Sequence, residues 1–354
     1  MTFIFIIVIC LCLYGFSFEK NGFRDDYATR QQTLPVNGIF VILVFLRHFK
    51  MYIDTGWDDR LFLLFDMVAS QLIVVPFLFF SGYGVMLSLC EKGDAYIHAF
   101  PLHRLFKTWL HFALAVLLFV LAALLQGKAY PLSRILPALT GWDSVGNSNW
   151  FMFTTFVLYI ITWVSARVIL WQGGSGSAAS AHIKKKYYFL AVCSILTILY
   201  MIIMSSFKDT YFYDTAFAWP CGMAFALFKR PLETMLQKDR RIYPCLVVGL
   251  FFILLISTLC KKAGCGIPSD LFWSLSFAGL LILVLMKIQV GNRILLFLGS
   301  FSFEIYILQR LPMIILSGWM QNKYMLFGCT AALTLLMAAG FRILTRKLDQ
   351  ALSL

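Results

Sequence analysis

The chain has 354 residues, of which 60% are apolar and 13% are charged, and its mean hydropathy is +0.81. A soluble domain carries about a quarter charged residues, so the composition excludes an ordinary soluble globular fold. The net charge of +13 does not indicate nucleic-acid binding, because the Lys and Arg residues lie in polar breaks between apolar runs. The chain is therefore predicted to be embedded in a lipid bilayer.

Apolar runs long enough to cross a bilayer follow one another along the whole chain. A spanning helix needs about 20 such residues, and the runs lack the alternating polarity of a transmembrane barrel. We therefore predict an all-α fold, a polytopic transmembrane helical bundle with about ten core spans plus one extra N-terminal span. The expected spans are residues 2–18, 35–53, 66–90, 108–126, 149–171, 187–206, 211–228, 243–260, 269–287, 294–318 and 323–341.

Basic residues are distributed unevenly between the loops. The loops after odd-numbered spans and the C-terminal tail hold 20 Lys and Arg residues, the loops after even-numbered spans hold 8, and two lie within spans. Because basic loops stay in the cytoplasm, we predict a multi-pass cell-membrane protein with its N-terminus outside and its C-terminus in the cytoplasm. The first span lacks a basic start and a small-residue cleavage site, which favours a retained helix over a signal peptide.

This pattern predicts three parts of the chain. Residues 1–34 form the extra helix and a cytoplasmic loop, 35–345 the membrane domain, and 346–354 a short cytoplasmic tail.

The second span carries unusual polar residues. Asn37 and His48 are eleven residues apart, which is within about 20° of three full helical turns, so they share one face. Histidine can act as a general base near neutral pH, and a polar stripe suggests a lined path into the membrane. The alternatives are a histidine that faces lipid headgroups and an asparagine that starts a helix. Arg47 and Asp66 also need partners at this depth and are a candidate interhelical pair.

The segment from His98 to Lys107 is expected on the cytoplasmic side. Arg104 and Lys107 are three residues apart and would share a helix face. Such a pair suits a phosphate-bearing ligand, and ordinary anchoring by basic residues is the alternative.

The loop over 127–149 is the longest one expected outside. It carries Trp142 and Asp143 and leads into Trp150. Aromatic and carboxylate side chains bind sugars by stacking and hydrogen bonding, whereas an interfacial aromatic belt is the alternative.

Two further features lie in later loops. The Gly- and Ser-rich stretch at 173–179 has the composition of a flexible linker. Cys260 and Cys265 flank an outer loop, where a disulfide is one possibility in an oxidising compartment.

The tenth span contains Glu304, Gln309 and Arg310. Glu304 and Arg310 are six residues apart and lie on different faces, so each needs a partner on another helix or in water. Pro312 is expected to kink this span.

Taken in order, these motifs resemble the integral-membrane acyltransferase-3 family, whose members transfer acyl groups, usually acetyl, to cell-surface glycans. The resemblance covers roughly residues 35–341. The matching stretches are Asn37 to His48, Phe79 to Gly84, Arg104 with Lys107, Trp150-Phe151 with Tyr159, and Gly299 to Tyr306. Two positions depart from the family pattern: Asn37 stands where the family often has Arg or Lys, and Gln309 stands where many members have a second His.

The resemblance implies an enzyme that moves an acyl group from cytoplasmic acyl-CoA, such as acetyl-CoA, to a hydroxyl of an extracytoplasmic glycan. His48 would be catalytic, Arg104, Lys107 and Asn37 would bind the donor, and Trp142, Asp143, Trp150 and Tyr159 would bind the acceptor. Ser81, or a backbone amide near Gly82, is a candidate for stabilising the oxyanion. No tightly bound cofactor and no metal are expected, because HExxH and CxxC patterns are missing. The alternative function is a transporter or flippase for a lipid-linked glycan.

Overall fold

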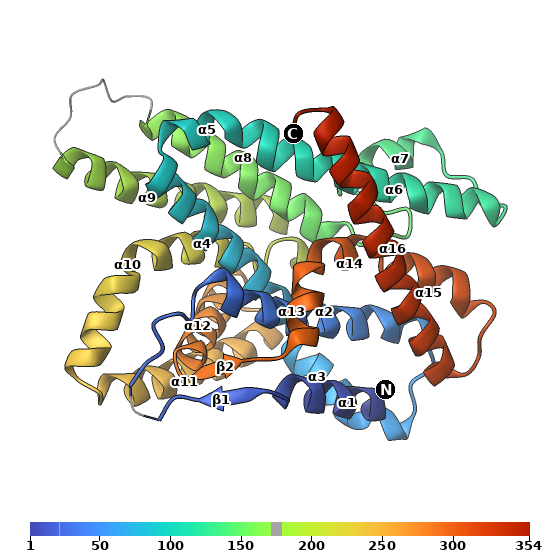
Figure 1. Cartoon of the computed structure of the whole chain (residues 1–354), viewed down its shortest axis with the longest axis horizontal. Helices are drawn as coiled ribbons and strands as arrows, with labels where there is room; N and C mark the ends of the chain where they lie inside the picture. Colours follow the sequence, from blue (N-terminus) through green and yellow to red (C-terminus); the bar gives the residue numbers. More distant parts are fainter. Residues whose placement is uncertain (21, 171–178) are drawn as a thin grey trace.

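The computed structural model describes residues 1–20, 22–170 and 179–354, and it leaves out the side chains of residues 170 and 179–184. The described chain is almost entirely helical, as predicted, with one short pair of strands (Figure 1). Within this part, eight helical stretches are long and apolar enough to cross a membrane, or nine if a bent pair counts as one span. The all-α fold with several helices apolar enough to span a membrane is confirmed, whereas the number of eleven spans stays a prediction.

The elements follow in chain order. The first half contains α1 (Thr2–Leu13), β1 (Phe16–Phe18), α2 (Arg30–Phe49), α3 (Arg60–Ala69), α4 (Val75–Lys92), α5 (Asp94–Phe100), α6 (Lys107–Leu125), α7 (Leu132–Ala138) and α8 (Trp150–Leu170). The second half contains α9 (Ala179–Ser205), α10 (Ala218–Lys238), α11 (Ile242–Lys262), α12 (Ile267–Leu285), β2 (Ile288–Val290), α13 (Arg293–Ser300), α14 (Ser302–Leu308), α15 (Arg310–Ser317) and α16 (Lys323–Ala351). The Gly- and Ser-rich stretch at 173–179 lies almost wholly outside the described residues.

The expected first span over 2–18 is wrong in its extent. Helix α1 has 12 residues, or about 18 Å at 1.5 Å per residue, which is short of a bilayer core of about 30 Å. Gly15 has a φ of +80°, which ends the helical course, and β1 then pairs antiparallel with β2. The backbone after α1 therefore finds its hydrogen bonds in a two-stranded ribbon and not in a longer helix.

Two further spans also differ from the prediction. The expected span over 211–228 begins as an α-helix only at Ala218, because residues 206–217 form turns and a short 3-10 helix, Thr210–Phe212. The expected span over 294–318 is broken, with an angle of 63° between Arg293–Ser300 and Ser302–Ser317. Pro312 lies beyond that bend and does not cause it, but α14 ends at Leu308, four residues before Pro312, where a proline removes the helical hydrogen bond.

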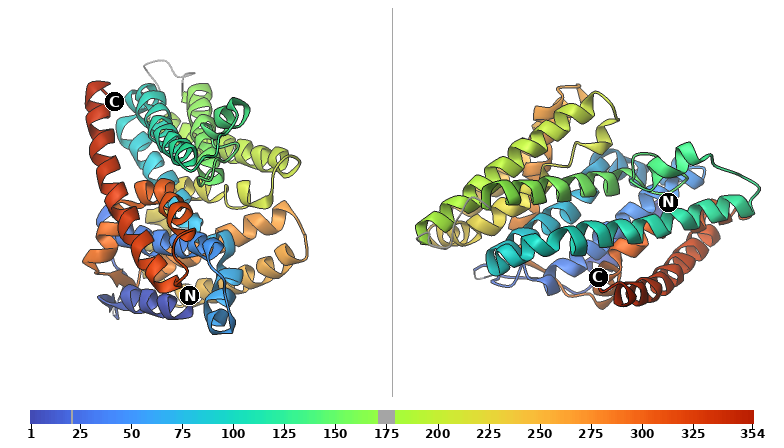
Figure 2. Two further views of the ribbon diagram at one scale, coloured as in Figure 1. Left: turned by 90° about the vertical axis from the view of Figure 1, so that its right-hand side faces the viewer. Right: turned by 90° about the horizontal axis from the view of Figure 1, so that it is seen from above.

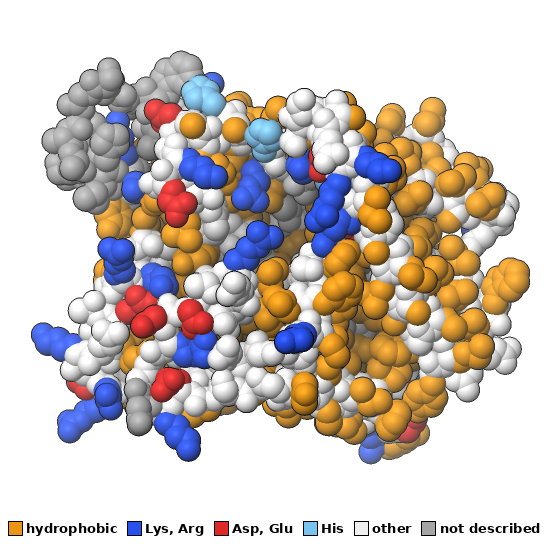
Figure 3. Space-filling model, in the orientation of Figure 1, with side chains coloured by type: hydrophobic (Ala, Val, Ile, Leu, Met, Phe, Trp, Pro, Cys, Tyr) orange, Lys and Arg blue, Asp and Glu red, His pale blue; other side chains and the backbone are white. Residues whose placement is uncertain are grey.

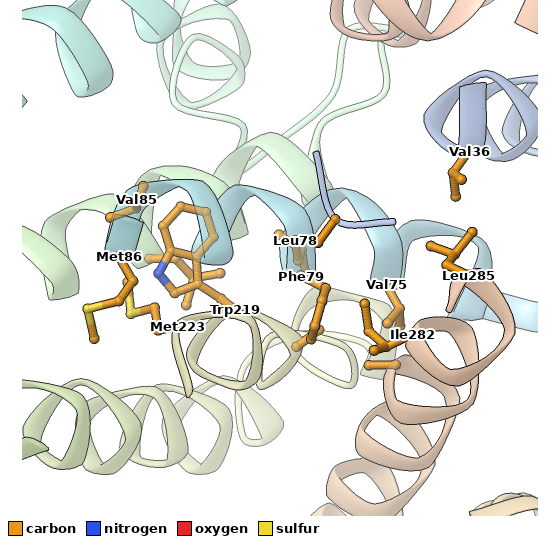
Figure 4. Close-up of a cluster of buried hydrophobic side chains, with 14 of the residues drawn as sticks. Val36, Val75, Leu78, Phe79, Val85, Met86, Trp219, Met223, Ile282 and Leu285 are labelled. Carbon is orange, nitrogen blue, oxygen red and sulfur yellow. The ribbon is translucent and has the colours of Figure 1, made fainter. Parts of the chain in front are cut away.

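Glycines let two pairs of helices cross at backbone contact. A Cβ on Gly82 in α4 would lie 2.2 Å from the carbonyl oxygen of Trp219 in α10, and one on Gly222 would lie 1.9 Å from that of Phe79. Small residues allow such close approach between membrane helices. Figure 4 shows the apolar side chains of this crossing, with Trp219 beside Met86 and Val85.

The second crossing joins α2 to α13. A Cβ on Gly38 would lie 2.0 Å from the carbonyl oxygen of Leu295, and a Cβ on Gly299 would lie 1.7 Å from that of Leu34. Both crossings fix helices that line the site described below.

The outer surface of the bundle is apolar over much of its area. Helix α11 buries only Ser257 and exposes large residues such as Phe251, Phe252 and Ile256. Helix α16 packs on α14 and α15 and runs along the edge of the bundle in both views of Figure 2. Figure 3 shows mainly apolar side chains over α15 and α16, while most acidic side chains gather at the opposite end of this face. Such surfaces suit contact with lipid.

Polar contacts between loops join segments that the sequence places on the same side. Lys287 donates to the carbonyl of Gly22 beside the β1–β2 pair, all on the predicted cytoplasmic side. Lys323 pairs with Asp58 at 2.7 Å, and Lys208 donates to the carbonyl of Trp142 at 2.9 Å, all on the predicted outer side. The fold is thus compatible with the predicted topology, and the orientation in the membrane stays a prediction.

Candidate functional site

One cavity has a volume of about 520 Å³ and is called here the Arg104 cavity. It lies between α2, α4, α6, α8 and α14, and its polar lining residues are Arg30, Thr33, Asn37, Ser81, Arg104, Thr108, Thr155, Tyr159, Ser302 and Tyr306. Both Arg30 and Arg104 are exposed at the cavity. An opening with two cations and an interior with hydroxyl and amide groups can take a ligand with a charged end and a polar chain.

A second cavity of about 350 Å³ is called here the His48 cavity. Its polar lining residues are Arg47, His48, Lys50, Gln71, Ser148, Asn149, Trp150, Tyr211, Tyr306 and Arg310. It is built from the C-terminal part of α2, the start of α15 and the loop that precedes α8.

The two cavities meet inside the bundle. Both are lined by Val74 and Tyr306, so these side chains form a wall between them. The Tyr306 ring lies 5.1 Å from the Phe151 ring and 6.3 Å from the His48 ring, measured between centroids. Asn37 lines one cavity and His48 the other. The polar stripe predicted on α2 therefore runs from one cavity to the next.

His48 is surrounded by cations. Nδ1 of its ring is buried and makes no hydrogen bond to the part of the chain that the structure describes. Arg47 lies 3.1 Å from Asp66, and Lys50 contacts the same carboxylate, so Asp66 forms ion pairs with two cations. The predicted pair between Arg47 and Asp66 is present. Arg310 completes the cationic lining.

Arg104 and Lys107 do not line one cavity, contrary to the shared site that was predicted. Arg104 belongs to a π-helical turn, Pro101–Phe106, whose wider turn changes the angular spacing to Lys107. Lys107 pairs with Asp349 of α16 at 2.8 Å and lines neither cavity. Arg104 instead lies beside Tyr96 and Tyr159 and lines the Arg104 cavity.

The four residues predicted to bind the acceptor are also separated. Trp142 stacks under Lys208, whose Nζ is 4.0 Å from the ring centroid, and Asp143 accepts a hydrogen bond from the Ser144 amide at 2.7 Å. Neither Trp142 nor Asp143 lines either cavity. Trp150 lines the His48 cavity, whereas Tyr159 lines the Arg104 cavity. Trp142 and Asp143 therefore make contacts within and between loops, and Tyr159 lies in the same cavity as Arg104 and Asn37.

Ser81 lines the Arg104 cavity, but the backbone amide near Gly82 cannot serve as an oxyanion donor. That amide lies in the middle of α4, where helical hydrogen bonds already use the N–H groups. Gly82 instead serves the contact with α10.

The polar residues of α14 and α15 have distinct partners. Glu304 accepts two hydrogen bonds from Arg342 of α16, both at 2.7 Å. Gln309 is fully buried and donates weakly to the Tyr306 carbonyl at 3.4 Å. Arg310 donates to the Tyr52 hydroxyl at 3.0 Å. As predicted for this span, Glu304 and Arg310 use different partners from separate elements.

A buried ionic cluster lies near the His48 cavity. Lys261 is 2.9 Å from Asp214 and also contacts Asp270, while Ser274 donates to the Asp214 carbonyl. Burial raises the pKa of Asp214 to about 6, although the nearby Lys261 opposes this shift. Asp214 lies in the turns before α10, outside the spanning helices.

Several lining residues were missed in the sequence. Arg30 looked like an ordinary cytoplasmic base, and Thr33, Thr155 and Ser302 are neutral residues within apolar runs. Ser148 and Asn149 lie at the end of the loop over 127–149, in which only Trp142 and Asp143 were predicted as site residues. Since the notable polar groups of α2 lie on one face, the same periodicity applied to α8 and α14 would have found Thr155 and Ser302.

No cluster of three or more His, Cys, Asp and Glu residues that could hold a metal occurs within residues 1–20, 22–170 and 179–354. Cys260 and Cys265 are free thiols in this structure, so the possible disulfide is not formed. Comparison of the chain with protein-family models, curated proteins and solved structures found no match. The two cavities are therefore the features of this chain that bear on its function.

Proposed function

We propose that this chain is a membrane-bound O-acyltransferase that moves an acyl group, such as acetyl, from acyl-CoA to a hydroxyl of an extracytoplasmic glycan. The observation that carries the proposal is the pair of cavities that meet at Tyr306, with Arg104 and Asn37 in one and His48 in the other. The excess of Lys and Arg in loops on the side of the Arg104 cavity supports a cytoplasmic donor site.

The donor would occupy the Arg104 cavity. The exposed guanidinium groups of Arg30 and Arg104 would bind the CoA phosphates. Asn37, Thr155 and Tyr159 would offer hydrogen bonds to the amide groups of the pantetheine arm, whose thioester end would point toward Tyr306. Lys107 has no part in this site because Asp349 holds it.

The transfer would take place at the wall between the cavities. His48 takes the proton of the acceptor hydroxyl as that oxygen attacks the thioester carbonyl carbon. The C–O bond forms, the C–S bond breaks, and the CoA thiolate leaves and recovers the proton from the imidazolium. The Tyr306 hydroxyl is a candidate donor to the oxyanion, because this residue lines both cavities. A transient acyl-His48 is the variant of this mechanism.

A transporter or flippase for a lipid-linked glycan is the second candidate. Two cavities that reach a thin wall from different ends of α2 are also what an alternating-access passage requires. That function needs no acyl donor and releases no CoA.

The decisive experiment measures CoA release from acetyl-CoA by the purified protein in nanodiscs, with and without a polysaccharide acceptor. CoA should be quantified by chromatography, because the nine cysteines of the chain would react with thiol reagents. His48→Ala should lower turnover by a factor on the order of 100 or more. His98→Ala is the matched control, since His98 is exposed and lines neither cavity. Full turnover in His48→Ala would end the proposal, and glycan movement without CoA release would favour the transporter.

A further inference from the structure

The His48 cavity has an excess of positive charge. Its lining includes Arg47, Lys50 and Arg310, and none of the lining residues is Asp or Glu. Asp66 is the carboxylate that pairs with Arg47 and Lys50, and Asp214, whose charge also reaches Arg47, is held by Lys261. The cavity therefore presents three cations against one carboxylate bound to its wall.

Among the three cations that line the His48 cavity, Arg310 is the one with no carboxylate partner in the described residues. Its Nε donates to the Tyr52 hydroxyl at 3.0 Å and its Nη1 donates to the Asn147 carbonyl at 3.1 Å. Both acceptors are neutral, and no ion pair of Arg310 occurs within residues 1–20, 22–170 and 179–354. A partly buried guanidinium in a membrane protein is costly unless a negative charge compensates it.

Unused hydrogen-bond donors lie beside this guanidinium. Ser148 is 3% exposed and lines the cavity, and its hydroxyl makes no hydrogen bond within the described chain. The adjacent Asn147 is 1% exposed, and its Nδ2 is likewise unused in that part of the structure, while its Oδ1 accepts from the Val145 amide at 3.0 Å. Buried donors normally have partners, so the Ser148 hydroxyl, which lines the cavity, points to a ligand that accepts hydrogen bonds.

We propose that the His48 cavity binds an anionic group of the acceptor, with Arg310 as its principal ligand and Ser148 as a second donor. The acceptor is then an acidic glycan that carries carboxylate or phosphate groups. The planar guanidinium suits both groups because it can donate two parallel hydrogen bonds. Anchoring the charge at Arg310 brings neighbouring sugar hydroxyls into the cavity that His48 lines. This inference rests on the proposed function for the identity of the acceptor.

The test measures binding and does not depend on turnover. The purified protein in phosphatidylcholine nanodiscs is titrated by calorimetry with a hexamer of galacturonic acid and with the neutral hexamer of galactose. The acidic hexamer should bind at least tenfold more tightly. Arg310→Gln should remove that difference, and Arg310→Lys should retain part of it. Arg60→Gln is the matched control, because Arg60 is exposed, stacks on Trp57 at 3.5 Å and lines neither cavity.

Three results would overturn the inference. The first is equal affinity for the acidic and the neutral hexamer. The second is an Arg310→Gln variant that binds like Arg60→Gln but transfers acetyl more slowly to both acceptors, which would assign Arg310 to the oxyanion. The third is loss of hexamer binding when phosphatidylglycerol is added to the nanodiscs, which would identify a lipid headgroup as the occupant. Absence of CoA release together with selective binding of the acidic hexamer would instead reject the acyltransferase and keep the anion site.

Discussion

The crossing of α2 and α13 provides a quantitative test of the fold around the candidate site. In Gly299→Ala the new Cβ would lie 1.7 Å from the Leu34 carbonyl oxygen and 2.9 Å from the Gly38 nitrogen. Ordinary contact begins at 3.4 Å, so the helices must separate by about 1.7 Å, the difference between 3.4 and 1.7 Å. Both neighbours are backbone atoms, which cannot rotate away.

The expected cost is therefore at the upper end of overpacking, about 3 kcal/mol. For a chain of this size that loss corresponds to a decrease in Tm on the order of 5 °C. Unfolding can be followed by tryptophan fluorescence in detergent, with the wild type, Gly299→Ala and a control variant heated at the same rate. Gly328→Ala is the control, because a Cβ at Gly328 in α16 meets no atom within 4 Å. Alanine is the better helix former by about 1 kcal/mol, so this control should match or exceed the wild type.

Equal Tm values for the Gly299→Ala and Gly328→Ala variants would refute the reasoning. They would mean that α2 and α13 do not approach at backbone contact. The placement of Leu34 and Asn37 along the Arg104 cavity would then lose its support.

Two further predictions concern donor binding and the buried ionic cluster. Arg104→Gln should raise the KM for acetyl-CoA about tenfold. Lys107→Gln should leave this KM within twofold, because Lys107 pairs with Asp349 outside the cavity. Initial rates of CoA release measure both KM values, and equal effects of the two substitutions would contradict the prediction. The pKa of Asp214 is raised to about 6 from an ordinary value of 3.8, so the folded state binds this proton more tightly than the unfolded state. The contribution of Asp214 to stability should therefore be fully present below about pH 4 and fall by up to about 3 kcal/mol as the pH rises through 6. Asp214→Asn should reduce this slope in a Tm series from pH 4 to 7, and an unchanged slope would contradict the assignment.

The sequence predicted the residues of the candidate site better than their grouping. Asn37 and His48 were placed on one face of a helix by their spacing alone, because the α-helix has a fixed period. The pair between Arg47 and Asp66 was also foreseen, since charges at membrane depth need partners. Arg104 and Lys107 were grouped wrongly, because the same periodicity was applied across a π-helical turn that local sequence did not reveal.

Two other features show why the spatial grouping could not be predicted. Tyr159 was assigned to the acceptor with Trp150, although it lies nine positions further along α8 and lines the other cavity. Tyr306 appeared only as the last residue of a motif, yet it separates the cavities. Which side chains share a cavity depends on how helices far apart in the chain cross, and that information is not local.

The sequence by itself determined that this protein is a helical membrane protein, because long apolar runs in a bilayer must satisfy their backbone hydrogen bonds internally. It also determined which loops carry the basic residues. Only the tertiary structure decided that α1 is too short to span a bilayer alone and that the stretch over 294–318 breaks at Phe301. It also decided that Arg310 lines the His48 cavity and forms no ion pair with Asp or Glu within the described residues. These outcomes depend on the pairing of β1 with β2 after α1, on the backbone contact at Gly299 and on charge pairs between distant helices. Such contacts have no signature in local composition or periodicity.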